Sequence, residues 1–381
     1  MNILVVSVPA SGHLNPLLPL VDAFLAQGDR VVVATGSDPG GAVARSGAEF
    51  WPAGHGEMDW FATVQSRVRG FPGDGLAPER INYYFVPRLF ADIAAIDMID
   101  DVLACGRQLG PDLVLFETYA FAGPLAAVLL GVPGVHHLIG PMLPHAVLEL
   151  ANDALSPLWR SFGRDAPGYG GVYSGITIEL SPPSLQALQI PSGERLELRP
   201  APLPEREATA SSPPLVYVTL GTFFGGNLDV FRTVLAGLAA EALEVVVTVG
   251  ADQDPAALAP LPANARVEPF IPQADLLPRC SAVVHHGGSG TMFGSLAHGV
   301  PQVVIPQGAD NFINGGLLAA AGAGKVLEPG EVTPERVRDA LRSVLEEGSY
   351  ADAARRLATE VAAMPASAEV AQMLLSRFGG S

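Results

Sequence analysis

The sequence predicts an α/β protein with two parallel sheets, each built from alternating strands and helices. Near the N-terminus, the apolar run at residues 2–8 precedes a helical pattern, and a second apolar run follows at 30–35. At residue 215 the run LVYVT begins the same alternation again. Apolar runs that alternate with helical patterns indicate parallel strands joined by right-handed crossovers. Two such series in 381 residues indicate two domains.

The first half of the chain predicts one sheet and its covering helices. Between the first two strands, apolar residues recur at helical spacing at Leu14, Leu17, Val21 and Leu25. Gln27-Gly28 then ends this helix. Further strands are predicted at Glu49–Pro52, Pro111–Phe116 and Val132–Leu138, and an apolar helix around Ala120–Leu130. The stretch from Gly54 to Pro78 has no clear period, which is typical of a binding loop or of disorder.

A change of composition between Arg195 and Pro214 marks the boundary between the domains. This stretch contains five prolines and the run Thr209-Ala210-Ser211-Ser212, which is typical of a linker. We therefore predict an N-terminal domain at 1–205, a linker at 206–214 and a C-terminal domain at 215–365. Strands of the second domain are predicted at Leu215–Thr219, Glu244–Val249, Arg266–Phe270, Ala282–Val284 and Gln302–Ile305. Residues 366–381 are expected to form a helix that packs back on the N-terminal domain.

Composition and charge exclude several classes of function. The formal net charge of −17 disfavours nucleic acid, whose binding depends on lysine and arginine, and it disfavours a lasting hold on anionic lipid. The two cysteines, Cys105 and Cys280, have no metal-ligand spacing. The N-terminus begins directly with a predicted strand, and no apolar run reaches about 18 residues. We therefore expect a soluble cytoplasmic protein without a nucleic-acid or membrane partner.

The stretch Ala282–Gly299 (AVVHHGGSGTMFGSLAHG) carries the strongest functional signal. A buried strand leads into a glycine-rich turn at 287–291 and then into a helix start. Glycine lets the backbone approach a ligand closely, and the first turn of a helix presents N–H groups and a positive dipole end to an anion. Ser289 and Thr291 add hydroxyl groups, and His286 can supply an imidazole. A glycine-rich turn alone also suits a tight strand-to-helix connection, but the full pattern predicts a phosphate site.

The next loop adds polar groups beside this turn. After the predicted strand Gln302–Ile305, Asp310 and Asn311 open another helix. Loops that follow neighbouring parallel strands line one crevice, so this acid–amide pair is expected to face the phosphate site. Carboxylate and amide groups hydrogen-bond sugar hydroxyls. Together the two loops predict a site for a sugar diphosphate.

The motifs HHGGSGT and GVPQVVIPQGADNFIN resemble the donor-binding half of bacterial natural-product glycosyltransferases, the group that includes macrolide and calicheamicin enzymes. The resemblance covers nearly the whole chain and is strongest from Ile271 to Lys325. It implies the GT-B architecture, in which two Rossmann-like domains with parallel sheets face a central cleft. The N-terminal domain would bind the acceptor and the C-terminal domain the nucleotide-sugar donor. The implied reaction is inverting transfer of a sugar to a hydroxyl group of an apolar natural-product aglycone, such as a polyketide.

His13 is the candidate general base. It follows a glycine shortly after the first predicted strand, where crevice residues lie in parallel sheets. From this position alone, a capping or packing role is favoured over catalysis. The resemblance places the catalytic base in this Gly-His pair, and an unperturbed imidazole titrates at roughly pH 6.5. A carboxylate usually fixes the tautomer of such a base. The family commonly has Asp after the Pro-Asp-Leu-Val strand, whereas this chain has Glu117. An ordinary strand-end role for Glu117 stays open, and Asp112 and Asp22 are weaker candidates.

The resemblance also implies the residues of the donor site. They are Gly12, Thr222, Ile271, Pro272, Gln273, His286, Gly288, Ser289, Gly290, Thr291, Asp310 and Asn311. The commoner partner of the acid is Gln, so the shorter Asn311 should contact the sugar differently. Relatives that use uridine donors have a Glu near the place of Gly294, where it binds both ribose hydroxyls. Its absence favours a thymidine diphosphate (TDP) sugar, which carries 2′-deoxyribose, over a uridine diphosphate (UDP) sugar.

Acceptor and metal sites are less defined by the sequence. Phe71, Tyr84 and His137 are candidates for acceptor binding, although aromatic clusters and such histidines are more often core residues. No cluster of Cys, His and carboxylates suits a metal, so we expect a metal-independent enzyme whose only co-substrate is the nucleotide sugar. A lipid-acceptor transferase of the same fold and a non-catalytic helper protein of glycosyltransferases are the alternatives. The oligomeric state is open, and a homodimer is one option.

Overall fold

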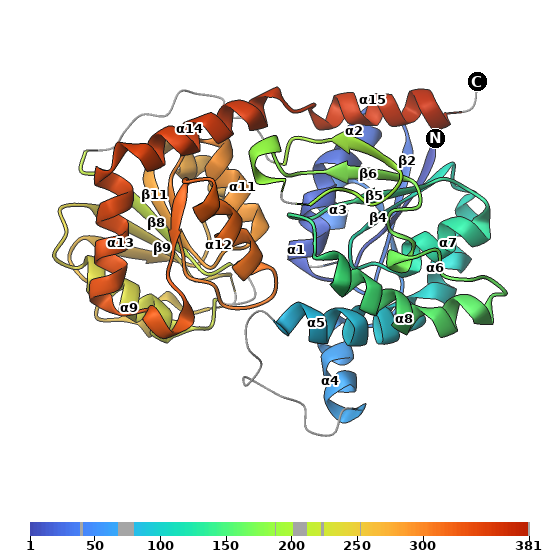
Figure 1. Ribbon diagram of the computed structural model, residues 1–381, viewed down its shortest axis with the longest axis horizontal. Helices are drawn as coiled ribbons and strands as arrows, with labels where there is room; N and C mark the ends of the chain where they lie inside the picture. Colours follow the sequence, from blue (N-terminus) through green and yellow to red (C-terminus); the bar gives the residue numbers. More distant parts are fainter. Residues whose placement is uncertain are drawn as a thin grey trace. The chain divides into compact units, whose positions relative to one another are not determined.

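The computed structural model describes residues 1–38, 41–67, 80–186, 188–200, 212–221, 225–251 and 253–379. The chain folds into two compact units, each with one parallel sheet covered by helices (Figure 1). Unit 1 comprises Met1–Leu180, Leu188–Leu198 and Pro365–Ser381, and unit 2 comprises Ser181–Ala187 and Arg199–Met364. The prediction of two Rossmann-like α/β domains is confirmed. Residues 206–211 of the predicted linker lie outside the described residues.

Unit 1 contains a seven-stranded parallel sheet in the order β3-β2-β1-β4-β5-β6-β7. Its strands are β1 (Asn2–Val6), β2 (Arg30–Thr35), β3 (Glu49–Pro52), β4 (Leu113–Glu117), β5 (Gly134–His137), β6 (Ile176–Glu179) and β7 (Glu194–Glu197). Its α-helices are α1 (Ser11–Leu14), α2 (Leu18–Ala26), α3 (Ala42–Ser46), α4 (Glu57–Arg67), α5 (Ile81–Phe85), α6 (Ala95–Leu109), α7 (Ala122–Leu130), α8 (His145–Ser161) and α15 (Ser367–Phe378). The π-helical segment η5 (Val86–Ala94) joins α5 to α6.

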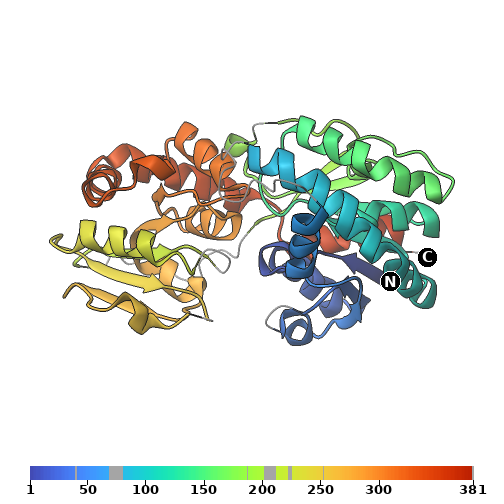
Figure 2. The same cartoon turned by 90° about the horizontal axis from the view of Figure 1, so that it is seen from below.

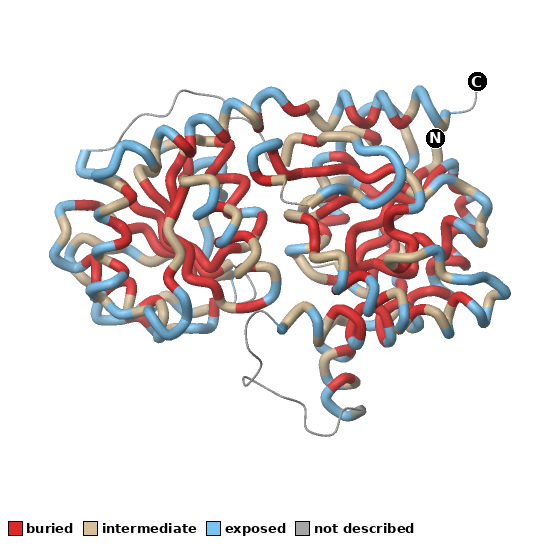
Figure 3. Tube along the Cα trace, in the orientation of Figure 1, coloured by how far each residue is buried: buried red, intermediate tan, exposed pale blue. Residues whose placement is uncertain are grey.

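The centre of this sheet is apolar on both faces because helices cover both faces. Ile3, Leu4, Val5 and Val6 of β1 have no exposed surface, and the strands form the buried interior of the unit in Figure 3. Helix α8 packs along η5, as the neighbouring green and blue helices of Figure 2 show. The last helix, α15, packs on α2, where Gln27 Nε2 donates a hydrogen bond to the carbonyl oxygen of Ala368 at 3.3 Å.

The structure corrects one prediction in this unit. The aperiodic stretch that suggested a binding loop or disorder contains the helix α4. Trp60 and Val64 are its fully buried side chains, and they lie one turn apart. Two apolar positions are too few to give a recognisable helical period, so the sequence alone did not predict the helix. Residues 68–78 of the same stretch lie outside the described residues.

Unit 2 contains a six-stranded parallel sheet in the order β10-β9-β8-β11-β12-β13. Its strands are β8 (Leu215–Thr219), β9 (Glu244–Thr248), β10 (Ala265–Glu268), β11 (Cys280–His285), β12 (Gln302–Val304) and β13 (Gly324–Val326). Its α-helices are α9 (Leu228–Leu238), α10 (Gln273–Leu276), α11 (Ser289–Ala297), α12 (Asn311–Ala320), α13 (Pro334–Glu346) and α14 (Gly348–Ala363). No helix among the described residues of either unit is long and apolar enough to cross a membrane.

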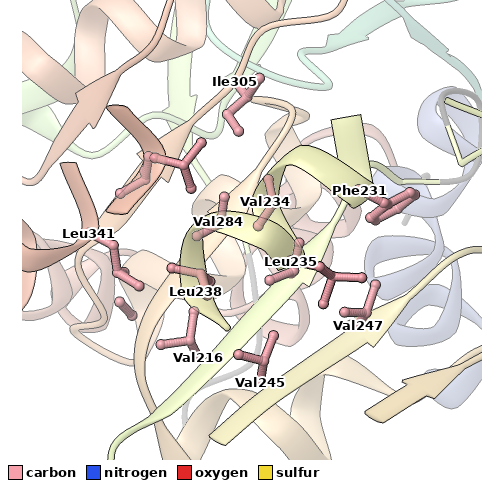
Figure 4. Packing of buried hydrophobic residues seen from close by; sticks show 14 of the residues in the cluster. Val216, Phe231, Val234, Leu235, Leu238, Val245, Val247, Val284, Ile305 and Leu341 are labelled. Atoms are coloured by element: carbon pink, nitrogen blue, oxygen red, sulfur yellow. The ribbon is translucent and has the colours of Figure 1, made fainter. Parts of the chain in front are cut away.

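Alternate residues of the central strands of unit 2 fill two separate cores. Val216, Val245 and Val284 pack with Phe231 and Leu238 of α9 on one face of the sheet (Figure 4). The intervening residues of the same strands pack on the other face. Side chains of successive strand residues point to opposite faces, so a continuous apolar run is what a sheet with two covered faces requires.

In each sheet the strand order reverses beside the first strand of the unit. The reversal lies between β1 and β4 in unit 1 and between β8 and β11 in unit 2. Ligands of open α/β sheets bind outside the carboxyl ends of the strands at such a point. The loops that follow these four strands are therefore where a functional site is expected in each unit.

Candidate active site

His13 and Glu117 meet at the reversal point of unit 1. His13 lies in α1, which follows β1, and Glu117 is the last residue of β4. The Nδ1 atom of His13 is 3.3 Å from Oε2 of Glu117. Glu117 has no exposed side-chain surface, whereas 16% of the His13 side chain is exposed. The carboxylate therefore contacts the imidazole from the protein interior, and the imidazole keeps access to solvent.

The backbone fixes Glu117 in this position. Its Oε1 accepts a hydrogen bond from the backbone nitrogen of Val8 at 3.2 Å, and its Oε2 accepts one from the backbone nitrogen of Tyr119 at 2.8 Å. A carboxylate held in this way can fix the tautomer of His13 and stabilise its protonated form. Because Nδ1 is turned to Glu117, Nε2 is the ring nitrogen directed away from the carboxylate.

Two aromatic rings pack against the imidazole of His13. The ring centroid of Tyr119 lies 4.9 Å from that of His13 in an edge-to-face arrangement, and the ring of Phe90 lies 5.7 Å away. Phe90 belongs to η5, and π-helical segments are rare and frequent at functional sites. These rings restrict the orientations of His13. Tyr119 belongs to no recognisable motif, so the sequence alone did not identify it as a site residue.

The other candidates of unit 1 lie elsewhere. The Oδ2 atom of Asp112 accepts a hydrogen bond from the backbone nitrogen of Asn2 at the amino ends of the strands, opposite His13. Asp22 is an exposed residue of α2. Tyr84 is half-buried under the guanidinium of Arg88, which lies 4.3 Å from its ring centroid. Gly12 is exposed, and Phe71 lies outside the described residues.

His137 is buried at the end of β5. Its side chain has no exposed surface, and its Nδ1 lies 2.7 Å from the carbonyl oxygen of Leu138. The structure therefore places His137 in the core of unit 1, and its assignment to acceptor binding stays a prediction. A histidine at the end of a buried strand has the same sequence signature in either role.

The glycine-rich turn of unit 2 is shaped around the ring of His286. A Cβ at residue 288 would lie 2.4 Å from Nε2 of His286, and a Cβ at Gly221 would lie 2.6 Å from its Cε1. The imidazole thus fills the space between two loops, and 9% of the residue is exposed. Gly287 has a φ of 97°, which L side chains rarely adopt. Packing and backbone conformation both require glycine here.

Gly290 differs from these glycines because no protein atom occupies the place where a side chain would lie. It is exposed, and a Cβ at this position would meet nothing within 4 Å. Gly290 lies in the first turn of α11, where no side chain caps the helix. The N–H groups of a first helical turn have no partner within the helix, and together with the dipole they attract an anion. The start of α11 is therefore a candidate anion site of unit 2.

The side chains of Ser289 and Asp310 bind each other. Ser289 Oγ donates to Oδ2 of Asp310 at 2.9 Å, and Nδ2 of Asn314 donates to both groups at 3.0 Å. Asn314 also donates to the carbonyl oxygen of Gly287 at 2.8 Å. This network joins α11 to α12 and holds the turn in place. Asn314, which sequence analysis missed, is the residue that links the two loops.

The side chain of Asn311 forms hydrogen bonds within its own loop. It is 2% exposed, and its Oδ1 accepts hydrogen bonds from the backbone nitrogens of Gln307 and Gly308, both at 3.3 Å. The Oδ1 atom of Asn311 therefore shapes the turn at residues 307 and 308. Nδ2 of the same side chain donates to Oδ1 of Asp310 at 3.4 Å, so the acid–amide pair lies together, and its role in sugar binding stays a prediction.

The loop after β10 presents an apolar surface at the same edge of the sheet. Phe270 is 66% exposed, which is unusual for a large aromatic side chain, and Pro272 is also exposed. Ile271 is half-buried against the second core of the unit. Gln273 is tied to α11, because its Nε2 donates to Oγ1 of Thr291 at 3.0 Å. Thr222 lies outside the described residues.

The described residues contain no group of three or more His, Cys, Asp and Glu side chains that could hold a metal ion. The absence of a metal requirement stays a prediction.

Four buried histidines should make the protein sensitive to acid. Burial lowers the pKa of His136 and His285 to about 3 and that of His137 and His286 to about 4. Between about pH 6.5 and 4 the unfolded chain therefore binds more protons than the folded chain, and acid favours unfolding. Each histidine contributes a slope of up to about 1.4 kcal/mol per pH unit. We expect the urea midpoint to fall steeply from pH 6.5 to 4.5, and a constant midpoint would contradict this prediction.

Comparisons with known proteins identify the family. Residues 232–376 match the family model described as erythromycin biosynthesis protein CIII-like, C-terminal domain. The elloramycin glycosyltransferase ElmGT of Streptomyces olivaceus is 34% identical, over 100% of this chain and 98% of its own length. The chain belongs to the family of antibiotic glycosyltransferases. This glycosyltransferase is also 33% identical to the L-demethylnoviosyl transferase of Streptomyces niveus, over 98% and 97% of the two chains.

Solved structures agree with this assignment. The glycosyltransferase SsfS6 of Streptomyces sp. SF2575, complexed with thymidine diphosphate, matches with a TM-score of 0.77 and 29% identity. The match covers 99% of both chains. The predicted enzyme class, glycosyltransferase, is confirmed.

Proposed function

We propose that this glycosyltransferase moves a deoxysugar from a TDP-sugar donor to a hydroxyl group of an apolar natural-product aglycone, with inversion at the anomeric carbon. The observation that carries the proposal is the contact of His13 with the buried Glu117, 3.3 Å apart. A fixed carboxylate behind a solvent-accessible imidazole is the arrangement of a general base. The name of ElmGT as an antibiotic glycosyltransferase supports the acceptor class.

In the proposed reaction, His13 Nε2 takes the proton of the acceptor hydroxyl. The acceptor oxygen then forms a bond to the anomeric carbon from the side opposite the diphosphate. The bond between the anomeric carbon and the phosphate oxygen breaks, and TDP leaves with that electron pair. The imidazolium is stabilised by Glu117, and the charge that grows on the diphosphate is stabilised by the N–H groups at the start of α11.

The donor site is proposed to use backbone groups more than side chains. Ser289 Oγ already binds Asp310, so the N–H groups of residues 289–291 would hold the diphosphate. The open space at Gly290 would give it room. Burial lowers the pKa of His286 to about 4, so its imidazole is neutral near pH 7 before a phosphate binds. Exposed Phe270 and Pro272 would pack against the nucleotide base.

The proposed preference for TDP over UDP rests on the lack of a side chain at Gly294. A Cβ at this position would lie 3.2 Å from Cδ1 of Leu277 and 3.3 Å from Oε1 of Gln273. Residue 294 therefore adjoins the loop that would hold the nucleoside, yet it provides no carboxylate for a ribose 2′-hydroxyl. The thymidine diphosphate in the SsfS6 complex supports the same donor class.

Calorimetric titration with TDP and UDP tests the donor site. We expect TDP to bind about tenfold more tightly than UDP, a difference of about 1.4 kcal/mol. Because a ligand that binds only the folded state stabilises it by mass action, TDP should also raise the melting temperature. Equal or tighter binding of UDP would contradict the proposed preference. Failure to bind either nucleotide would contradict the proposed donor site.

A further inference from the structure

His285 is the first of the two histidines in the glycine-rich motif, and the reaction described above gives it no role. It is the last residue of β11, and its side chain has no exposed surface. Burial is the main reason that its pKa is lowered to about 3, so the imidazole is neutral near pH 7. A buried polar ring is costly unless its nitrogens have partners. The contacts of the ring therefore indicate what the residue does.

The ring of His285 faces the turn through Nδ1. This atom accepts a hydrogen bond from the backbone nitrogen of Gly287 at 3.1 Å. A neutral imidazole accepts through one nitrogen and donates through the other, so the proton of His285 lies on Nε2. The buried His137 of unit 1 has the opposite tautomer, because its Nδ1 lies 2.7 Å from the carbonyl oxygen of Leu138. His285 is thus specifically an acceptor for the loop that follows it.

Gly287 is held at both of its backbone polar groups. Its N–H donates to His285, and its carbonyl oxygen accepts from Nδ2 of Asn314 in α12 at 2.8 Å. Its φ of 97° turns the chain from β11 toward α11, which begins at Ser289. Glycine itself restricts the backbone little. The two hydrogen bonds therefore determine the direction in which the chain enters α11.

Gln302 supports the same helix from the neighbouring strand. In the pairing of β11 with β12, Gln302 lies beside Val283 and Val304 lies beside His285, so the side chains of Gln302 and His285 point to the same face of the sheet. Nε2 of Gln302 donates to the carbonyl oxygen of Met292 in α11 at 3.3 Å. The Oε1 atom of Gln302, an acceptor, and Nε2 of His285, a donor, are both buried. Two polar side chains of the sheet thus lie under the turn and the helix start.

We propose that His285 is a positioning residue of the donor site: its Nδ1 holds the N–H of Gly287 and thereby orients the N–H groups at the start of α11 toward the diphosphate. His285 lies behind the turn and does not contact the ligand. Without an acceptor at this place, the buried N–H of Gly287 loses its partner and the turn rearranges. The nucleoside is proposed to bind at Phe270 and Pro272, so only the diphosphate is affected. The inference rests on the proposed donor site.

Two amide substitutions of His285 test this role. The side-chain oxygen of asparagine can take the place of Nδ1 and accept from Gly287, whereas the longer glutamine reaches the place of Nε2. Calorimetric titration with TDP and with thymidine would be carried out on the full chain, at a temperature at which circular dichroism shows each variant to be folded. We expect His285→Gln to bind TDP about tenfold more weakly than the wild type, and His285→Asn to bind it within about twofold. Both variants should bind thymidine as the wild type does.

The matched control is His136→Gln, the same substitution at a histidine of unit 1 that also has no exposed surface. It should leave TDP binding unchanged. Three results would overturn the proposal: equal affinities of the two His285 variants for TDP, a loss of thymidine binding as large as that of TDP binding, or the same loss in His136→Gln. A failure of the proposed donor site appears separately, as a wild-type protein that does not bind TDP.

The wild-type protein tests the contact even if the variants do not fold. With histidine labelled with nitrogen-15, NMR distinguishes protonated from unprotonated ring nitrogens. Between about pH 8 and 6, where a histidine of ordinary pKa titrates, His285 should keep its proton on Nε2 and none on Nδ1. A proton on Nδ1 would exclude the hydrogen bond from Gly287 and overturn the proposal.

Discussion

Replacing His13 with asparagine is expected to slow sugar transfer by about 100- to 10,000-fold, the usual contribution of a general base. Asparagine keeps a polar side chain next to Glu117, whose buried carboxylate is already held by the backbone nitrogens of Val8 and Tyr119. The variant should therefore fold and bind TDP as the wild type does, because the proposed donor site lies in unit 2. Rates of transfer at saturating donor and calorimetric titration with TDP measure the two properties separately.

Glu117→Gln is the companion variant for this prediction. Glutamine can still accept the bond from Val8 but carries no negative charge to stabilise the imidazolium. We expect this variant also to slow sugar transfer. It should lower the pKa of His13 that appears on the acid side of the pH–rate profile. Transfer by His13→Asn at more than a tenth of the wild-type rate would contradict the assignment of His13 as the base.

Gly290→Val is expected to weaken TDP binding at least 100-fold without loss of stability, which corresponds to about 2.7 kcal/mol of binding energy. A side chain at this position points into open space in the first turn of α11, where the diphosphate is proposed to sit. Valine would therefore displace the ligand, while its Cβ would meet nothing within 4 Å in the protein. Calorimetric titration gives the affinity, and the urea midpoint gives the stability.

The matched control for this prediction is Gly316→Val. Gly316 is also exposed, lies inside α12, and would have nothing within 4 Å of an added Cβ. It should leave TDP binding unchanged. Gly288→Ala, unlike Gly290→Val, should lower the stability of the protein. The Cβ of the new alanine would clash with His286 and destabilise the fold by about 1–3 kcal/mol. Normal TDP binding by Gly290→Val would contradict the placement of the diphosphate.

Most of the fold could be predicted from apolar runs because parallel strands are buried on both faces. The strands β2, β3 and β8 begin and end at the predicted residues. Helix α4 could not be predicted, since its buried residues Trp60 and Val64 give too short a pattern. Its position depends instead on hydrogen bonds to Asp97, a residue 37 positions away from Trp60.

The candidate site was predictable in its residue types but not in how each side chain is used. The motifs indicated His13 and Glu117, which the structure brings together. They also indicated Asn311, but a motif does not reveal that its amide is occupied by the backbone of residues 307 and 308.

The measurement that tests the central claim most directly is the anomeric configuration of a transferred sugar. The enzyme would be incubated with α-configured TDP-deoxysugars and a panel of apolar polyketide aglycones, and the product would be examined by mass spectrometry and proton NMR. Direct displacement assisted by His13 predicts a β-glycoside together with one TDP for each sugar transferred. An α-glycoside would contradict the proposed inverting mechanism with His13 as the general base.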